Sequence, residues 1–262
     1  MRSLRRAVSV LAVSSALAAC HSGSAPHTAG TPSASGVAVT PAQASASITT
    51  TPSASVSVSP SRSRSVARVV APAPAFRWHS RTVTATALGK SWHRGCPVGV
   101  SQLRAVTMTI WGFDDRAHTG TLVVNASTVP AIVGAFRRIY AARFPIRSMV
   151  PIAAYGGDDN ASMAADNTSA FNCRYAVANG PKQWSMHAYG DAVDIDTLEN
   201  PYTLDGRVYP PAGKPYTNRS RVRRGMIVAG TAPVRAFSSV GWGWGGRWSS
   251  SPDYQHFSSN GK

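Results

Sequence analysis

The sequence predicts a C-terminal domain that contains both strands and helices, because two strand-like segments precede an amphipathic helix. Val106, Met108 and Ile110 alternate with small or polar residues, which is typical of a strand. A second strand-like run covers residues 121–125, and the turn-like residues between the two runs predict a hairpin or a close pair. From about residue 129 to 143 apolar residues recur at helical spacing, so we expect a helix whose apolar stripe packs into the core.

The remainder of this domain is predicted to contain short elements and long loops. Residues 156–183 and 200–218 are rich in turn-forming residues and are expected to be loops. Residues 192–195 have the character of a strand. Short helices are predicted near residues 221–229 and after Thr231, which can cap a helix with a proline early in it.

Residues 1–20 resemble an export signal. A basic start is followed by the apolar segment Ala7–Leu17, which is too short to cross a membrane comfortably. The segment ends in Leu17-Ala-Ala-Cys20, which resembles a bacterial lipobox, in which the cysteine is lipidated and becomes the mature N-terminus. An ordinary cleaved signal peptide is the alternative. We expect an exported lipoprotein, anchored through Cys20 to the outer face of the cell membrane beside the cell wall.

Residues 21–75 are expected to form a disordered linker between this signal and a folded domain that covers residues 76–262. The linker consists almost entirely of Ser, Ala, Thr, Pro, Val and Gly, and it lacks Leu, Phe, Tyr and Trp. Such a composition buries too little apolar surface to offset the loss of chain entropy on folding. Aromatic residues begin at Phe76, where the folded domain is therefore expected to start.

The chain is strongly basic, with 27 Lys and Arg against 11 Asp and Glu and a formal net charge of +16. No carboxylate side chain occurs before Asp114. This charge favours a polyanionic partner such as nucleic acid, anionic lipid or an anionic cell wall. Because the sequence has no helix-turn-helix, zinc-finger or RNA-binding signature, we expect no nucleic-acid partner and favour the membrane and the wall.

Of the 3 cysteines, Cys20 would be consumed by lipidation. Two cysteines in one domain outside the membrane most often form a disulfide, so we expect Cys96 and Cys173 to be bonded. Such a bond would stabilise the fold by about 4 kcal/mol in the chain-entropy model. It would also hold the neighbouring Arg174 in place. The alternative, in which one of the two cysteines binds a metal, is disfavoured.

A candidate metal site is formed by His187, Asp194 seven residues later, and His256 near the C-terminus. Two imidazoles and a carboxylate suit a zinc ion and would leave its fourth coordination position open for water. A histidine followed at this distance by an aspartate is common by chance. The motifs around the three residues, taken in order, make the prediction specific.

These motifs are Ser185-x-His187-x-x-Gly190-x-Ala192-x-Asp194, Trp244-Gly-Gly-x-Trp248 and Asp253-x-x-His256-Phe257. Together they resemble the zinc peptidases of family M15, which include D-alanyl-D-alanine carboxypeptidases and the L-alanyl-D-glutamate endopeptidases of bacteria and phage. The resemblance covers roughly residues 90–262, and two further segments resemble exported actinobacterial members, Phe171–Arg174 and Glu199–Tyr202. It implies a small α+β domain, an antiparallel sheet with packed helices, which is shared with the Hedgehog signalling domain.

The resemblance also implies the roles of individual residues. The Zn²⁺ ligands would be His187, Asp194 and His256. Asp253 would act as the general base and acid. Arg174 would steady the developing oxyanion or a substrate carboxylate. Ser185 would contact the substrate or orient a ligand, and both roles stay open.

Several other residues have weaker claims to a function. Asp196 could replace Asp194 as a ligand, but the spacing in the family favours Asp194. Glu199 is expected to be structural. Three histidines match no motif and are expected to be surface or structural residues: His79, His93 and His118. Large aromatic residues are usually core, so at least two of three tryptophans are expected there: Trp242, Trp244 and Trp248.

The resemblance implies a zinc enzyme that hydrolyses an amide bond in peptidoglycan stem peptides, and we expect it to be a monomer. It would be either a D-alanyl-D-alanine carboxypeptidase or an L,D-type endopeptidase. The alternative is a non-catalytic, zinc-stabilised lipoprotein that binds the cell wall. Asp253 argues against this alternative, because a structural site needs no base beside an open metal position.

Overall fold

The computed structural model describes residues 73–177 and 181–262. The predicted signal peptide with Cys20, and the predicted linker up to residue 72, lie outside the described residues. Within the described part of the chain, every helix is too short or too polar to cross a membrane.

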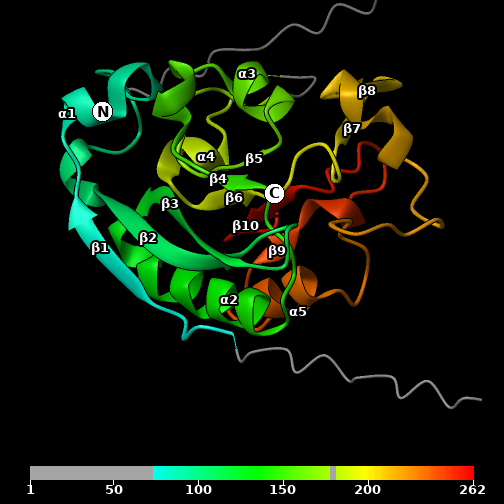
Figure 1. Ribbon diagram of the computed structural model, residues 1–262. Coiled ribbons are helices and arrows are strands. Elements are labelled where there is room, and N and C mark those ends of the chain that lie inside the picture. Colours follow the sequence, from blue (N-terminus) through cyan, green and yellow to red (C-terminus); the bar gives the residue numbers. More distant parts are fainter. Residues whose placement is uncertain (1–72, 178–180) are drawn as a thin grey trace, which may run out of the picture. The chain divides into compact units, whose positions relative to one another are not determined.

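An antiparallel sheet with the strand order β1-β2-β3 is built from the first part of the domain (Figure 1). Its strands are β1 (Trp78–Thr82), β2 (Leu103–Trp111) and β3 (Ala117–Asn125). The pairing of β2 with β3 is continuous from Leu103 opposite Asn125 to Trp111 opposite Ala117. Both predicted strands and their hairpin are confirmed, and β3 begins earlier than predicted because its ladder with β2 runs to Ala117.

Helix α2 (Val129–Ala141) lies against the sheet, with α5 (Ala232–Ser238) beside it (Figure 1). The predicted apolar stripe of α2 is buried: Val129, Ile132, Val133, Phe136, Ile139 and Tyr140. All of these residues except Tyr140 pack in one core cluster with the inward side chains of β2 and with α5, where Phe136 meets Phe237 edge to face at 6.1 Å between ring centroids. This burial confirms that the stripe is a core face.

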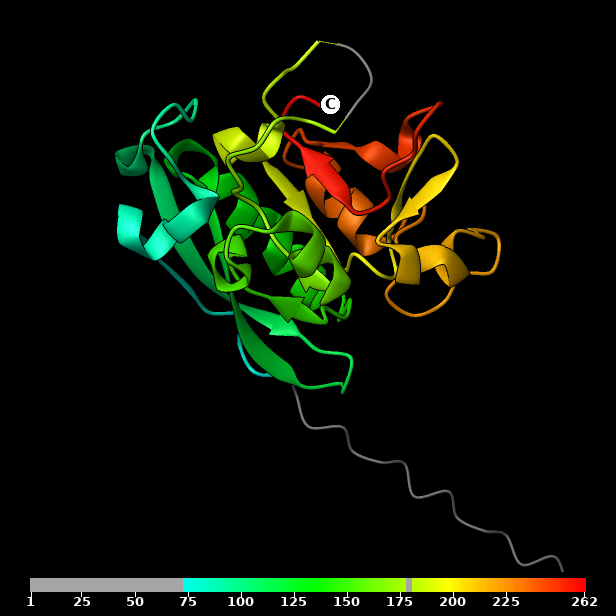
Figure 2. The same cartoon turned by 90° about the horizontal axis from the view of Figure 1, so that it is seen from above.

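A second, smaller antiparallel sheet has the order β6-β10-β9. Its strands are β6 (Ala192–Asp194), β10 (His256–Ser258) and β9 (Gly243–Trp244). Figures 1 and 2 show β6 and β10 side by side, although they are far apart in the sequence. The strand predicted at residues 192–195 is therefore β6, and the α+β class is confirmed, with several small sheets in place of one.

The remaining elements are short. Strands β4 (Ser148–Met149) and β5 (Asn167–Thr168) form a parallel pair, and β7 (Tyr202–Leu204) and β8 (Arg207–Tyr209) form an antiparallel pair. The other α-helices are α1 (Ala85–Leu88), α3 (Asp159–Ala164) and α4 (Met186–Tyr189). Short 3-10 helices occupy Gly89–Ser91, Val100–Gln102, Ala126–Thr128, Ile152–Tyr155, Pro211–Tyr216 and Gly245–Arg247.

Both segments that were predicted to be loops contain regular structure. Helix α3 forms because the Asp158 side chain caps it, accepting hydrogen bonds from the backbone nitrogens of Asn160 at 2.9 Å and Ala161 at 3.2 Å. Strands β7 and β8 form because Asp205 and Gly206 join them at φ values of 48° and 73°. Two consecutive residues with positive φ are what a tight two-residue hairpin turn requires.

The helix predicted near residues 221–229 is wrong. Asn200 accepts a hydrogen bond from the Ile227 backbone nitrogen at 2.6 Å and donates one to the Gly225 carbonyl at 2.9 Å. Arg219 donates to the Ile227 carbonyl at 2.6 Å. These tertiary bonds commit backbone groups that a helix would pair internally. The helix predicted after Thr231 is confirmed as α5.

Candidate metal centre

The second sheet sets two of the candidate ligands opposite each other. Asp194, at the end of β6, pairs with His256, at the start of β10. Directly opposed residues on antiparallel strands project from the same face of the sheet. Asp194 Oδ1 accordingly lies 3.1 Å from His256 Nδ1.

The third candidate, His187, is placed by the short helix α4 and the turn that follows it. Ser185 caps α4, and its Oγ accepts a hydrogen bond from the His187 backbone nitrogen at 3.2 Å. Gly190 ends the helix at a φ of 74°, and a Cβ at this position would lie 2.5 Å from the Asn125 nitrogen of β3. Glycine is therefore required for the turn that carries the chain from α4 into β6.

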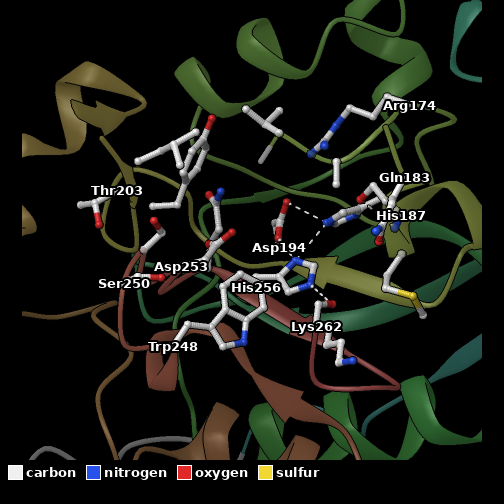
Figure 3. A pocket seen from close by; sticks show the side chains of 18 of the residues that line it. Arg174, Gln183, His187, Asp194, Thr203, Trp248, Ser250, Asp253, His256 and Lys262 are labelled. Carbon is white, nitrogen blue, oxygen red and sulfur yellow. Dashed lines mark hydrogen bonds and ion pairs between the residues drawn. The ribbon is translucent and has the colours of Figure 1, made fainter. Parts of the chain in front are cut away.

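Three ligand atoms converge in the cavity: His187 Nε2, His256 Nδ1 and the Asp194 carboxylate (Figure 3). His187 Nε2 lies 3.1 Å from Asp194 Oδ2 and 3.2 Å from His256 Nδ1. All three residues are buried: His187 is 3% exposed, Asp194 5% and His256 6%. The structure thus brings together all three residues that the sequence motifs singled out as ligands.

The far side of each imidazole ring has a backbone oxygen as its partner. His187 Nδ1 lies 2.6 Å from the Ala170 oxygen, and His256 Nε2 lies 3.3 Å from the Lys262 oxygen. Because these oxygens only accept hydrogen bonds, they assign the ring protons to the outer nitrogens and leave lone pairs on the inner ones. Two lone-pair nitrogens and a carboxylate that face each other fit a cation between them, and this donor set suits Zn²⁺.

The charges at this site are strongly linked. Burial disfavours the charged form of Asp194, but the adjacent rings of His187 and His256 outweigh burial and hold the pKa of Asp194 well below its usual range. Burial also disfavours charge on His187, and the Asp194 carboxylate outweighs it and raises the pKa of His187. Protons and a metal cation therefore compete for the same place.

Asp253 lines the same cavity, three residues before His256. Its Oδ1 is shielded from solvent and has no hydrogen-bond partner among the described residues. Burial, followed by the charge of Asp194, raises the pKa of Asp253 to about 7. A carboxyl group perturbed in this way within a cavity is a candidate for proton transfer.

Asp196, the alternative ligand, lies outside this group. Its Oδ1 accepts hydrogen bonds from the Arg147 backbone nitrogen at 2.8 Å and from Thr168 Oγ1 at 3.4 Å. It is fully buried and does not line the cavity. The geometry therefore favours Asp194, as the spacing of the motif does.

Arg174 lines the cavity and is held by Asp159, the first residue of α3. The Arg174 NH2 group lies 2.8 Å from Asp159 Oδ2, and Asn172 Nδ2 donates to Asp159 Oδ1 at 3.2 Å. Burial disfavours the charge of Arg174, but Asp159 and then Asp194 raise its pKa, so the guanidinium stays charged. Sequence reasoning missed Asp159 because its segment was predicted to be a loop, although the adjacent capping residue Asp158 is a recognisable helix signal.

The cavity has a volume of about 830 Å³. Tyr202–Gly206 of the β7–β8 hairpin contribute to its wall, as does Trp248. In Figure 3, Arg174 and Asp253 lie on different sides of Asp194, and Trp248 lies beside His256. Trp242 and Trp244 are buried in the core, which confirms the prediction for two of the three tryptophans.

The predicted disulfide between Cys96 and Cys173 is present. It joins the segment after α1 to the segment that precedes Arg174, and the Cys173 nitrogen also donates to the Ser91 carbonyl at 2.9 Å. Arg174 is therefore held from two directions, by the crosslink at its neighbour and by Asp159.

Glu199 and Asp166 are buried carboxyl groups that share an exposed partner, Arg147. Arg147 NH2 lies 3.5 Å from Glu199 Oε1, and Arg147 Nε lies 3.3 Å from Asp166 Oδ2. Burial, followed by a hydrogen bond with Asp166, raises the pKa of Glu199 to about 7. Glu199 does not line the cavity, so its place agrees with a structural role.

Replacing Glu199 by Gln is expected to flatten the pH dependence of the unfolding free energy. The folded pKa of about 7 lies above the ordinary value of 4.5, so the folded chain keeps a proton that the unfolded chain releases. The contribution of Glu199 to the free energy of unfolding is complete below the pKa of this group in the unfolded chain. It is lost as the pH rises through the pKa in the folded chain, at about 1.4 kcal/mol per pH unit. Denaturation at several pH values measures it, with Asp158→Asn as control, because asparagine caps a helix as well as aspartate does. Parallel curves for wild type and Glu199→Gln would contradict the assignment.

Residues 178–259 match the family model described as D-alanyl-D-alanine carboxypeptidase. The matched segment contains the four cavity residues His187, Asp194, Asp253 and His256, and it begins after Arg174. No curated protein and no solved structure matches the chain.

Proposed function

We propose that this chain, a member of peptidase family M15 through residues 178–259, uses Zn²⁺ to hydrolyse an amide bond in peptidoglycan stem peptides. The observation that carries the proposal is the convergence of His187, Asp194 and His256 in the cavity that also holds Asp253. We further propose that its α+β arrangement is the zinc fold that such peptidases share with the Hedgehog signalling domain.

His187, Asp194 and His256 would hold the ion, and bound Zn²⁺ would supply Lewis-acid activation of the scissile carbonyl and of water. Asp253 accepts the proton of the attacking water and returns it to the leaving amine, which is the usual task of a carboxyl group positioned beside the reacting atoms. Asp253 lines the cavity, and its Oδ1 has no hydrogen-bond partner among the described residues, which supports this role.

Arg174 supplies a fixed positive charge in the cavity. Its guanidinium steadies the negative charge that develops on the substrate oxygen, or a carboxylate of the substrate. Ser185 lines the cavity and also caps the helix that carries His187, which favours the role of orienting a ligand. A cavity of about 830 Å³ has room for several residues of a stem peptide, so both the carboxypeptidase and the endopeptidase forms of the proposal stand.

Replacing Asp159 by Asn is expected to lower kcat/KM by about 10-fold, because a charge-assisted hydrogen bond that positions Arg174 is weakened. The bound metal should be unchanged, since Asp159 is not one of the three converging ligands. Asp158→Asn is the matched control, because asparagine caps a helix as well as aspartate does. The kinetics use the muropeptide that the product-mass experiment shows to be cleaved. An unchanged kcat/KM in Asp159→Asn would show that Asp159 does not position Arg174 for the reaction.

The proposal is tested by incubating the purified protein with muropeptides, with and without a chelator, and measuring product masses. Loss of one terminal alanine identifies a carboxypeptidase, and a cut inside the stem identifies an endopeptidase. Absence of any metal-dependent product contradicts the enzyme. Retention on wall material without such a product supports the alternative, a non-catalytic zinc-stabilised lipoprotein.

Export and anchoring belong to the same proposal. A lipid on Cys20 would keep a monomeric enzyme at the outer face of the membrane, and the basic charge of the chain suits an anionic wall. Mass analysis of the N-terminal peptide of the mature protein tests this anchor, and an unmodified Cys20 would contradict it.

A further inference from the structure

A second cluster of potential metal ligands lies outside the catalytic residues and consists of His93, Cys96 and Cys173. One ligand atom of each lies within 4.8 Å of the others. His93 Nε2 is 3.4 Å from Cys173 Sγ, and the His93 backbone nitrogen donates to Cys96 Sγ at 3.2 Å. His93 is expected from the sequence to be a surface or structural residue, and the proposed function does not use it.

The local backbone presents His93 and Cys96 together. The Cys96 nitrogen donates to the His93 carbonyl at 3.2 Å, and Gly95 has a φ of 97°, so the four residues form a tight turn. Two residues between a pair of ligands is a common spacing in zinc sites, because it lets both side chains reach one ion. Sequence reasoning overlooked this spacing.

We propose that His93, Cys96 and Cys173 form a second metal site when the disulfide is reduced, selective for thiophilic divalent cations such as Zn²⁺. A dithiol reductant would break the S–S bond by transferring two electrons to the two sulfurs. It would itself become a disulfide, and its two protons would end on the cysteine thiols. Metal binding would then displace both protons, giving two thiolate ligands and one imidazole.

Access and burial suit this exchange. His93 is exposed and Cys96 is half-buried, so a small reductant reaches the bond, whereas Cys173 is buried and keeps its place. In the oxidised chain both sulfurs are committed to each other and cannot serve as thiolates. The metal would therefore take over the crosslink, joining the same two segments next to Arg174. This site does not depend on whether the cavity is catalytic.

The full chain, loaded with Co²⁺ in place of zinc, distinguishes the two sites by spectroscopy. Thiolate ligands produce a sulfur-to-cobalt charge-transfer band, which the sulfur-free set His187, Asp194 and His256 cannot give. A phosphine serves as reductant, since it becomes a phosphine oxide with oxygen from water and leaves no thiol to bind cobalt. We expect the band, with one additional equivalent of bound cobalt, only after reduction.

His93→Ala is the decisive variant. Loss of a partner that merely orients a ligand lowers metal affinity by about 10- to 100-fold. Loss of the ligand itself should therefore lower the affinity of the reduced site for Co²⁺, measured from the intensity of the band, by about 100-fold or more. His79→Ala, another exposed histidine, should leave it unchanged. The proposal is overturned by absence of the band in the reduced protein, by equal affinity in His93→Ala, or by equal affinity in urea-unfolded chain.

Discussion

Replacing Asp253 by Asn is expected to lower kcat by about 10²- to 10⁴-fold, which is the usual contribution of a positioned general base and acid. Asparagine has nearly the same shape and still fills the site but cannot accept or return the proton. The bound metal should be retained, because Asp253 is not one of the three converging ligands. Steady-state kinetics on the cleaved muropeptide, together with metal analysis of the same sample, measures both quantities.

The control for this variant is Asp114→Asn, which removes an exposed carboxylate at the β2–β3 turn and should leave kcat unchanged. A pH profile adds a second readout. Part of the pH dependence of kcat in the wild type should follow the titration of an acidic group, and this part should be absent from Asp253→Asn. A variant with near wild-type kcat would rule out Asp253 as the proton carrier.

Replacing Cys96 and Cys173 by Ser is expected to lower the free energy of unfolding by about 4 kcal/mol in the chain-entropy model, for a crosslink that spans 77 residues. Chemical denaturation of the oxidised protein and of the variant measures this loss. The single variant Cys96→Ser should lose about as much, because either substitution abolishes the bond. A loss below about 1 kcal/mol would mean that other contacts hold the two segments together.

The first hairpin and α2 could be predicted because their residues repeat at the spacing of the element. Val106, Met108 and Ile110 alternate in β2 and all three are buried, and the stripe of α2 packs against them. In a strand every second side chain faces the core, and in a helix the side chains that face the core recur about every 3.6 residues. No long-range information was needed for these elements.

The segment near residues 221–229 could not be predicted from its own residues. Its conformation depends on Asn200 and Arg219, whose side chains bond its backbone groups. Gly225 has a φ of 83°, and a Cβ there would lie 2.5 Å from the Phe113 ring of a distant turn. Contacts of this kind outweigh the local helix propensity of a short segment.

The candidate metal ligands and Asp253 were predictable from their motifs, whereas the residues that support them were not. Asp159 and the Ala170 oxygen act on the site from other segments, the Lys262 oxygen lies 6 residues beyond His256, and no motif marks any of them. Carbonyl oxygens carry no sequence signal, since every residue has one. Only the folded chain identifies which of them orient the imidazole rings.

Anomalous diffraction from zinc-loaded crystals shows whether the three candidate ligands bind the ion. We predict a peak bounded by His187 Nε2, Asp194 and His256 Nδ1, at about 2.0–2.2 Å from each ligand atom. The oxidised protein should show no peak at His93. Absence of a peak among the three ligands, in crystals that contain zinc elsewhere, would contradict the metal centre and the hydrolytic mechanism built on it.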